Sequence, residues 1–134
     1  MISYDDFQKV EIKIGKILSA EKIPETDKLL KLSVDFGNKE IVAVPTEEGS
    51  EAVVAPQERE IRQIVSGISF YFPDPQALVG TKCAFVTNLE YRKIKGFESQ
   101  GMILAIVVQG DEGTYPKFSL FKVGEDIPEG SRAK

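Results

Sequence analysis

The chain has 134 residues, of which 42% are hydrophobic, and a formal net charge of −4. This length and composition are typical of one domain with its own core, and no apolar run approaches the roughly 18 residues of a membrane-spanning helix. We expect no signal peptide, because the first residues, MISYDDF, contain no apolar stretch. The single Cys83 excludes an internal disulfide and indicates a reducing compartment, the cytoplasm.

The negative net charge opposes nucleic-acid binding by the chain as a whole, since phosphates are attracted to basic surfaces. The acid is concentrated, however: residues 46–60 hold five glutamates against one arginine, which accounts for the whole net charge. Residues 91–96 instead carry Arg92, Lys93 and Lys95 without any acid. Only such a local basic patch can attract phosphate in this chain.

The first third of the chain predicts a short helical turn followed by two strands. Ser3 and Asp6 have the spacing of a capping box, which predicts a helical turn at the N-terminus. Alternating apolar residues at 10–18 and 30–36 then predict two half-buried strands joined by a loop at 24–27.

The acidic segment 41–60 predicts an inserted hairpin. Two short β-prone runs, 41–44 and 52–55, lie on either side of a glutamate-rich turn. A hairpin of this kind would interrupt the path from the second predicted strand to the third.

The second half of the chain predicts three further strands and one short helix. The strands are expected at 61–65, 82–87 and 101–108. Asp74 before a proline predicts the start of a helix at about 75–79, between strands three and four. Five short strands with one such helix predict an all-β fold, a five-stranded OB-fold Greek-key barrel.

A C-terminal extension at about 109–134 follows the predicted barrel. It contains an apolar run of Phe118, Leu120, Phe121 and Val123. Either these side chains pack back on their own barrel or a second copy of the chain covers them. We expect the second arrangement, a symmetric homodimer.

The residue types that most enzymes use are missing from the sequence. The chain contains no histidine, which excludes Ser-His and Cys-His nucleophile pairs, and one cysteine cannot make a zinc site. Ser99 lacks the glycine two residues earlier that a nucleophile elbow requires, because that position is Phe97. We therefore expect no catalytic residue, no metal and no cofactor.

Residues 88–102 combine features of a nucleic-acid-binding loop. They join predicted strands four and five, and they contain three cations, two aromatic residues and several short polar side chains. In OB barrels this loop and the loop between strands one and two, which contains Lys28, flank the binding face. Alternatively, this segment is a solvated hairpin whose lysines protect a sheet edge from aggregation.

Segments 27–30 (DKLL), 62–68 (RQIVSGI) and 88–102 together resemble the tRNA-binding domain family. That family includes stand-alone bacterial tRNA-binding proteins and the C-terminal domain of many methionyl-tRNA synthetases. The resemblance covers about 7–132 and departs from the family at the acidic insertion and at Tyr91, where the family commonly has proline. It implies an OB barrel that recognises the shape of tRNA, often as a homodimer, and that assists aminoacylation either free-standing or as part of a synthetase. The expected RNA-binding residues are Lys28, Arg62, Asn88, Arg92, Lys93, Lys95, Ser99 and Met102.

Two other functions stay open. A chaperone of the related CsaA type is similar in fold and binds unfolded peptides, and an exposed apolar groove would favour it. A purely structural dimerisation or interaction domain is favoured by the low pI of about 5.0. A basic groove would favour tRNA.

Overall fold

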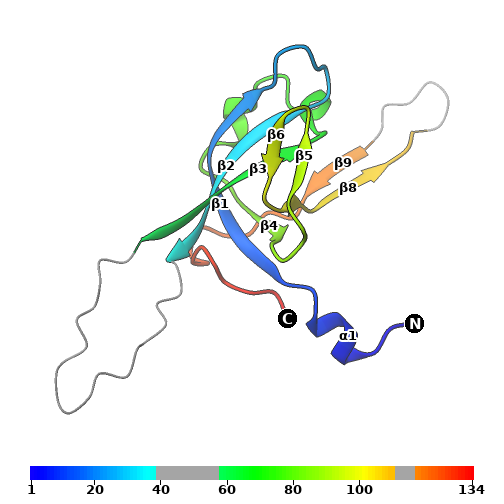
Figure 1. Ribbon diagram of the computed structural model, residues 1–134, viewed down its shortest axis with the longest axis vertical. Coiled ribbons are helices and arrows are strands. Elements are labelled where there is room, and N and C mark those ends of the chain that lie inside the picture. The colour runs from blue at the N-terminus through cyan, green and yellow to red at the C-terminus, as the bar shows by residue number, and fades with distance from the viewer. Residues whose placement is uncertain (39–57, 111–116) are drawn as a thin grey trace.

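The computed structural model describes residues 1–38, 58–110 and 117–134 (Figure 1). In chain order the elements are α1 (Tyr4–Gln8), β1 (Ile12–Lys22), β2 (Leu30–Asn38), β3 (Arg59–Ser66), the 3₁₀ turns η1 (Ser69–Tyr71) and η2 (Pro75–Leu78), β4 (Lys82–Val86), β5 (Arg92–Ile94), β6 (Phe97–Ser99), β7 (Met102–Ile103), β8 (Ala105–Val108) and β9 (Lys117–Leu120). The predicted all-β, OB-type fold is confirmed. No helix in these three ranges is long and apolar enough to cross a membrane.

One antiparallel sheet, in the order β3-β2-β1-β4-β7, forms the body of the molecule. The long strand β1 pairs with β4 through residues 12–16 and with β2 through residues 16–22. Because one strand serves two partners along its length, the sheet curls into a half-barrel (Figure 1). The register of the β1–β2 pair shifts between Ile17 and Ser19. Gly15 allows close packing at this part of β1, because a Cβ atom there would overlap the side chains of Val34 and Phe36.

The core lies inside this curl and comes from the inward-facing residues of the predicted alternating runs. Phe36 and Phe85 meet edge to face at a centroid distance of 5.3 Å. Burial of each such large apolar side chain is worth about 1.5–3 kcal/mol. The largest fully buried side chains are Ile17, Leu30, Leu32, Val34, Ile64, Leu78, Cys83 and Phe85.

The barrel is closed between β3 and residues 99–101 by individual hydrogen bonds. The Gln100 N–H donates to the Gln63 carbonyl at 2.8 Å, and the Val65 N–H donates to Ser99 Oγ at 3.0 Å. We call this contact the seam. It brings the start of the fifth barrel strand against β3, as an OB barrel requires.

Two predicted elements differ from those in the structure. The predicted helix at 75–79 is the 3₁₀ turn η2, capped by Asp74, whose Oδ1 accepts from the Gln76 N–H at 3.1 Å. The predicted strand 101–108 is wrong as one element: only β7 pairs with β4, while β8 leaves the barrel and pairs with β9. The apolar run has no break in sequence, so only its partners reveal the change.

Two other predictions concern the start of α1 and the segment between β2 and β3. The N-terminal capping box is confirmed, since the Asp6 N–H donates to Ser3 Oγ at 3.1 Å and the Ser3 N–H donates to Asp6 Oδ2 at 3.3 Å. The predicted inserted hairpin at 41–60 falls mostly on 39–57, outside the described residues; β3 begins at Arg59.

The C-terminal extension returns along the barrel. The Phe118 ring stacks on Tyr71 at 4.1 Å, and Leu120 belongs to the core. Further on, the Ile14 N–H donates to the Ser131 carbonyl at 2.8 Å. Phe118 and Leu120 therefore pack on their own barrel, contrary to the premise from which the homodimer was predicted.

Candidate nucleic-acid interface

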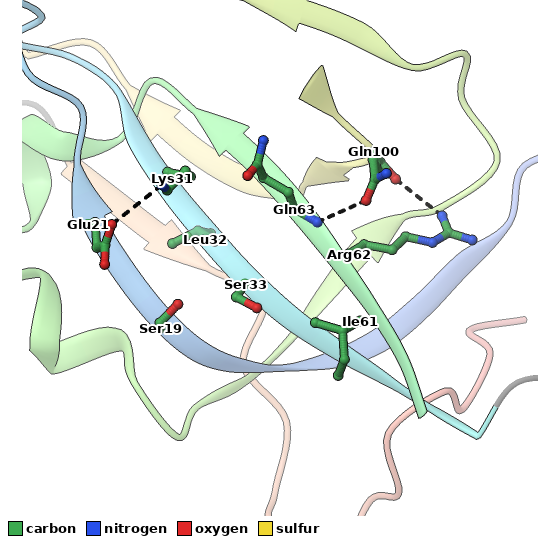
Figure 2. Close-up of a pocket in the computed structure, with 9 residues that line it drawn as sticks. All are labelled: Ser19, Glu21, Lys31, Leu32, Ser33, Ile61, Arg62, Gln63 and Gln100. Atoms are coloured by element: carbon green, nitrogen blue, oxygen red, sulfur yellow. Dashed lines mark hydrogen bonds and ion pairs between the residues drawn. The ribbon is translucent and has the colours of Figure 1, made fainter. Parts of the chain in front are cut away.

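A groove crosses the outward face of strands β1, β2 and β3 (Figure 2). Alternate residues of a strand face opposite sides of the sheet, so Ile64 enters the core while its neighbour Gln63 faces outward. The groove has a volume of about 390 Å³. Most of the side chains that line it can form hydrogen bonds. The lining residues are Ser19, Glu21, Lys31, Leu32, Ser33, Ile61, Arg62, Gln63 and Gln100.

Both cations of the groove are paired within the chain. Lys31 Nζ lies 3.5 Å from Glu21 Oε2. Arg62 Nη2 donates to Glu60 Oε1 at 2.6 Å, and Arg62 Nη1 donates to the Thr87 carbonyl at 2.6 Å. Arg62, with a side chain only 14% exposed, thus braces β3 against the end of β4. A phosphate would have to displace these partners to reach the guanidinium.

Strands β5 and β6 form a hairpin that stands beside this groove. Its register pairs Lys93 with Glu98 and Ile94 with Phe97. The turn is Lys95-Gly96, with φ of 51° and 85°, which is the two-residue geometry that matches the twist of a hairpin. Ile94 and Phe97 therefore share one face, and Lys93 and Glu98 share the other.

A second hollow lies between the hairpin tip and the loop that joins β1 to β2. It has a volume of about 460 Å³ and is lined by Ile23, Pro24, Glu25, Thr26, Lys95 and Phe97. Lys31 Nζ lies 5.2 Å from the centroid of the Phe97 ring. Since Lys31 lines the groove and Phe97 lines the hollow, the two spaces meet at this pair.

Five cations near the hairpin and the β1–β2 loop are exposed and have no ion-pair partner in the part of the chain that the structure describes. They are Lys22, Lys28, Arg92, Lys93 and Lys95. Exposed acids, among them Glu25, Asp27, Glu90 and Glu98, stand between them. The surface therefore offers separate cations at the margin of the hollows rather than one basic field.

The sequence matches the family described as a putative tRNA-binding domain over residues 12–55 and 50–132. The chain belongs to this family. It is 35% identical over 130 residues to methionine–tRNA ligase of Enterococcus faecalis and 50% identical over 106 residues to that of Methanoregula boonei. These matches cover 97% and 78% of this chain but only 16% and 12% of the two ligases, so the chain spans about a sixth or less of these relatives.

Solved structures agree with this assignment. A MetRS-related protein from Pyrococcus horikoshii superposes with a TM-score of 0.73 at 37% identity, covering 100% of this chain and 98% of that one. The CsaA chaperone of Bacillus anthracis superposes with a TM-score of 0.67 at 22% identity, covering 100% and 99%. The second likeness shows the fold alone.

Within this tRNA-binding domain, three of the predicted RNA-binding side chains make hydrogen bonds within the chain: Arg62, described above, Ser99 and Asn88. Ser99 is 5% exposed, and its Oγ accepts from the Val65 N–H at 3.0 Å while lying 3.0 Å from the Gly101 carbonyl. Asn88 Oδ1 accepts from the Glu11 N–H at 2.8 Å, and Asn88 Nδ2 donates to the Lys9 carbonyl at 2.6 Å. Asn88 thus holds the segment that follows α1.

The remaining five predicted residues lie at four places on the domain. Lys95 lines the hollow, while Arg92 and Met102 line a smaller depression of about 90 Å³ with Leu89 on the far side of the seam. Lys93 faces away from that depression, opposite Glu98. Lys28 is exposed in the β1–β2 loop, as expected. Direct RNA contact by each of them stays a prediction.

Sequence reasoning missed most of the groove. Its polar side chains Lys31, Ser33 and Gln63 alternate with the buried Leu32 and Ile64, and this alternation was the available signal. Gln100 had no such signal, because its position depends on the seam. Phe97 is one of the two aromatic residues that the sequence singled out in 88–102, but its place beside the groove depends on the hairpin.

Proposed function

We propose that this domain binds tRNA on the outward face of β1–β3, between the β1–β2 loop and the β5–β6 hairpin. The observation that carries the proposal is the pair of adjoining hollows on this face, in a member of the tRNA-binding domain family. In OB folds this face and these two loops bind oligonucleotides. The exposed cations Lys22, Lys28 and Lys95 supply phosphate attraction at its margin.

The domain acts in this proposal without catalysing a reaction. Cys83 is free and fully buried, and burial raises the pKa of its thiol, which makes it a poor nucleophile. The described ranges hold no cluster of three or more potential metal ligands. We infer a role in presenting tRNA to an aminoacyl-tRNA synthetase, either as part of that enzyme or free-standing. The free thiol of Cys83 is consistent with a location in the reducing cytoplasm.

A homodimer is part of the proposal, with a surface different from the one first expected. Ile106, Val107 and Val108 on β8 are 47%, 45% and 51% exposed, and Phe121 is 45% exposed. The two-stranded ribbon of β8 and β9 extends away from the barrel (Figure 1). Alternate residues face opposite sides of the ribbon, so a second copy that packs against the side with Ile106 and Val108 would cover these two side chains.

Sedimentation at micromolar concentration tests the assembly. We expect a dimer mass for the unaltered chain and a monomer mass for Ile106→Lys. A monomer mass for the unaltered chain that does not change as concentration rises would contradict the homodimer.

Peptide binding of the chaperone type is the second candidate. The exposed apolar side chains of Leu89, Tyr91 and Met102, between 45% and 53% exposed, favour it. The groove itself does not, because its lining is mainly polar.

A titration of fluorescein-labelled tRNA at two salt concentrations decides between the two functions. We expect saturable binding well below about 0.1 mM at physiological salt, where non-specific binding begins. Absence of tRNA binding, together with binding of reduced carboxymethylated α-lactalbumin, would favour the chaperone. The control ligand is an RNA duplex without tRNA shape.

A further inference from the structure

The hollow between the hairpin tip and the β1–β2 loop differs in chemistry from a phosphate site. It contains one cation, Lys95, and one acid, Glu25, beside the apolar surfaces of Ile23, Pro24 and Phe97. Its formal charge is therefore balanced, and the adjoining groove pairs its own cations with Glu21 and Glu60. An arrangement of this kind favours the neutral parts of a nucleotide, the base and the ribose.

The walls of the hollow are held in place before any ligand arrives. The Ile23 N–H donates to the Leu29 carbonyl at 3.2 Å, which closes the base of the loop. Thr26 Oγ1 donates to the Ile23 carbonyl at 3.0 Å within it. On the other side, the strand that carries Phe97 is anchored to β3, because Gln63 Nε2 donates to the Glu98 carbonyl at 2.9 Å. The Lys31 ammonium lies 5.2 Å from the centroid of the Phe97 ring.

The volume of about 460 Å³ lies in the range of small-molecule pockets, roughly 300–1,000 Å³. A base inside a duplex has both faces covered by its neighbours, so only an unpaired base can stack on Phe97. The groove continues from this ring past Lys31 to Ser33, Gln63 and Gln100, whose side chains can hydrogen-bond base edges and sugars.

We infer that this hollow binds one unpaired base of the RNA, with Phe97 as its stacking surface and the next nucleotides along the β1–β3 groove. This inference rests on the proposed function and adds to it that the domain contacts single-stranded nucleotides, not the outer shape of tRNA alone. Lys95 at the rim takes the phosphate of the stacked nucleotide. Binding therefore depends on stacking more than on charge, in keeping with a net charge of −4.

The sequence contains no tryptophan, so Phe97→Trp introduces a single, specific fluorophore at the site. We expect a single-stranded oligoadenylate of about eight nucleotides to quench its emission on binding. An RNA duplex of the same length leaves the emission unchanged. The matched control is Phe70→Trp, at an aromatic position that is 66% exposed and lies outside both hollows, and it shows no quenching.

Affinity gives the second readout. Phe97→Leu should weaken binding of the oligoadenylate by about five- to a hundred-fold, the range of one lost stacking contact, while Phe97→Trp retains it. Phe70→Leu should bind as the unaltered chain does. Circular dichroism and urea unfolding establish that each variant is folded.

The outcomes separate this inference from the proposed function. Saturable tRNA binding without quenching at position 97, or with equal quenching at position 70, would overturn the unpaired-base pocket and leave tRNA binding in place. Equal affinity of Phe97→Leu and the unaltered chain for oligoadenylate would also overturn it. Absence of any tRNA binding would overturn both.

Discussion

The segment between β4 and β7 has two parts that differ in what their side chains do. Its tip, around Lys95 and Phe97, projects beside a hollow and leaves its cations without an ion pair in the described ranges. Its return, from Ser99 to Gly101, closes the barrel against β3. A Cβ atom on Gly101 would lie 2.9 Å from Ile64 Cδ1 and 3.0 Å from the Val86 carbonyl oxygen, so this return has no spare room.

This comparison separates two meanings of a binding motif. Residues of one continuous motif can be needed for RNA binding because they touch RNA or because they hold the residues that do. The hydrogen bonds of Ser99 and Asn88 predict that they belong to the second group, and Arg62 on β3 is held in the same way. The exposure of Lys95 predicts that it belongs to the first. Loss of RNA binding alone cannot distinguish the groups, but stability measured in parallel can.

The largest expected effect is that of Ser99→Ala on stability. The change leaves the buried Val65 N–H without its acceptor, which costs about 1–3 kcal/mol. We expect the midpoint of urea unfolding to fall, while the dependence of the unfolding free energy on urea concentration stays unchanged.

The matched control for this prediction is Ser33→Ala. Ser33 lines the groove, so its loss should weaken RNA binding several-fold while changing stability by less than about 0.5 kcal/mol. If Ser99→Ala has the same urea midpoint as the unaltered chain yet loses tRNA binding, Ser99 contacts RNA directly and its hydrogen bond to Val65 does not stabilise the barrel.

A smaller and more local effect is expected from Asn88→Ala. The side chain links the end of β4 to Lys9 and Glu11, so its removal should speed amide hydrogen exchange at Glu11 and in α1. The global stability should fall by only about 0.5–1.5 kcal/mol, because α1 buries none of its residues.

The neighbouring Leu89→Ala serves as the control for Asn88→Ala, since Leu89 is 46% exposed and lines the 90 Å³ depression with Arg92 and Met102. This variant should leave the rate of amide hydrogen exchange in α1 unchanged. Unchanged exchange at Glu11 in Asn88→Ala, combined with a loss of tRNA affinity, would place Asn88 among the contact residues.

The sequence predicted the part of the fold that depends on local alternation. Strands β1 and β2 follow from apolar residues at every second position, whereas β3 and β4 follow from short apolar runs between turn residues. The hairpin strands β5 and β6 have three residues each, too few for such a pattern to appear. The roles of Ser99 and Asn88 depend on partners 34 and 77–79 residues away, which no local pattern contains.

The smallest effect concerns the salt dependence of binding and distinguishes the cations of the hairpin from one another. Lys95 borders the hollow, whereas Lys93 faces the other side of the hairpin, opposite Glu98. A phosphate contact to single-stranded RNA contributes about −0.7 to the slope of log affinity against log salt. Lys95→Ala should flatten the slope by about this amount, and Lys93→Ala by less, since Glu98 already offsets part of its charge.

Such a change of slope corresponds to roughly a two- to threefold difference in affinity over a fourfold range of salt. It therefore requires full titrations at several salt concentrations. Lys117→Ala, on β9 and outside both hollows, is the control and should keep the original slope. Equal slopes for Lys95→Ala and Lys117→Ala would mean that the hairpin tip does not meet phosphate. A larger change of slope for Lys93→Ala than for Lys95→Ala would indicate that the RNA binds on the opposite face of the hairpin.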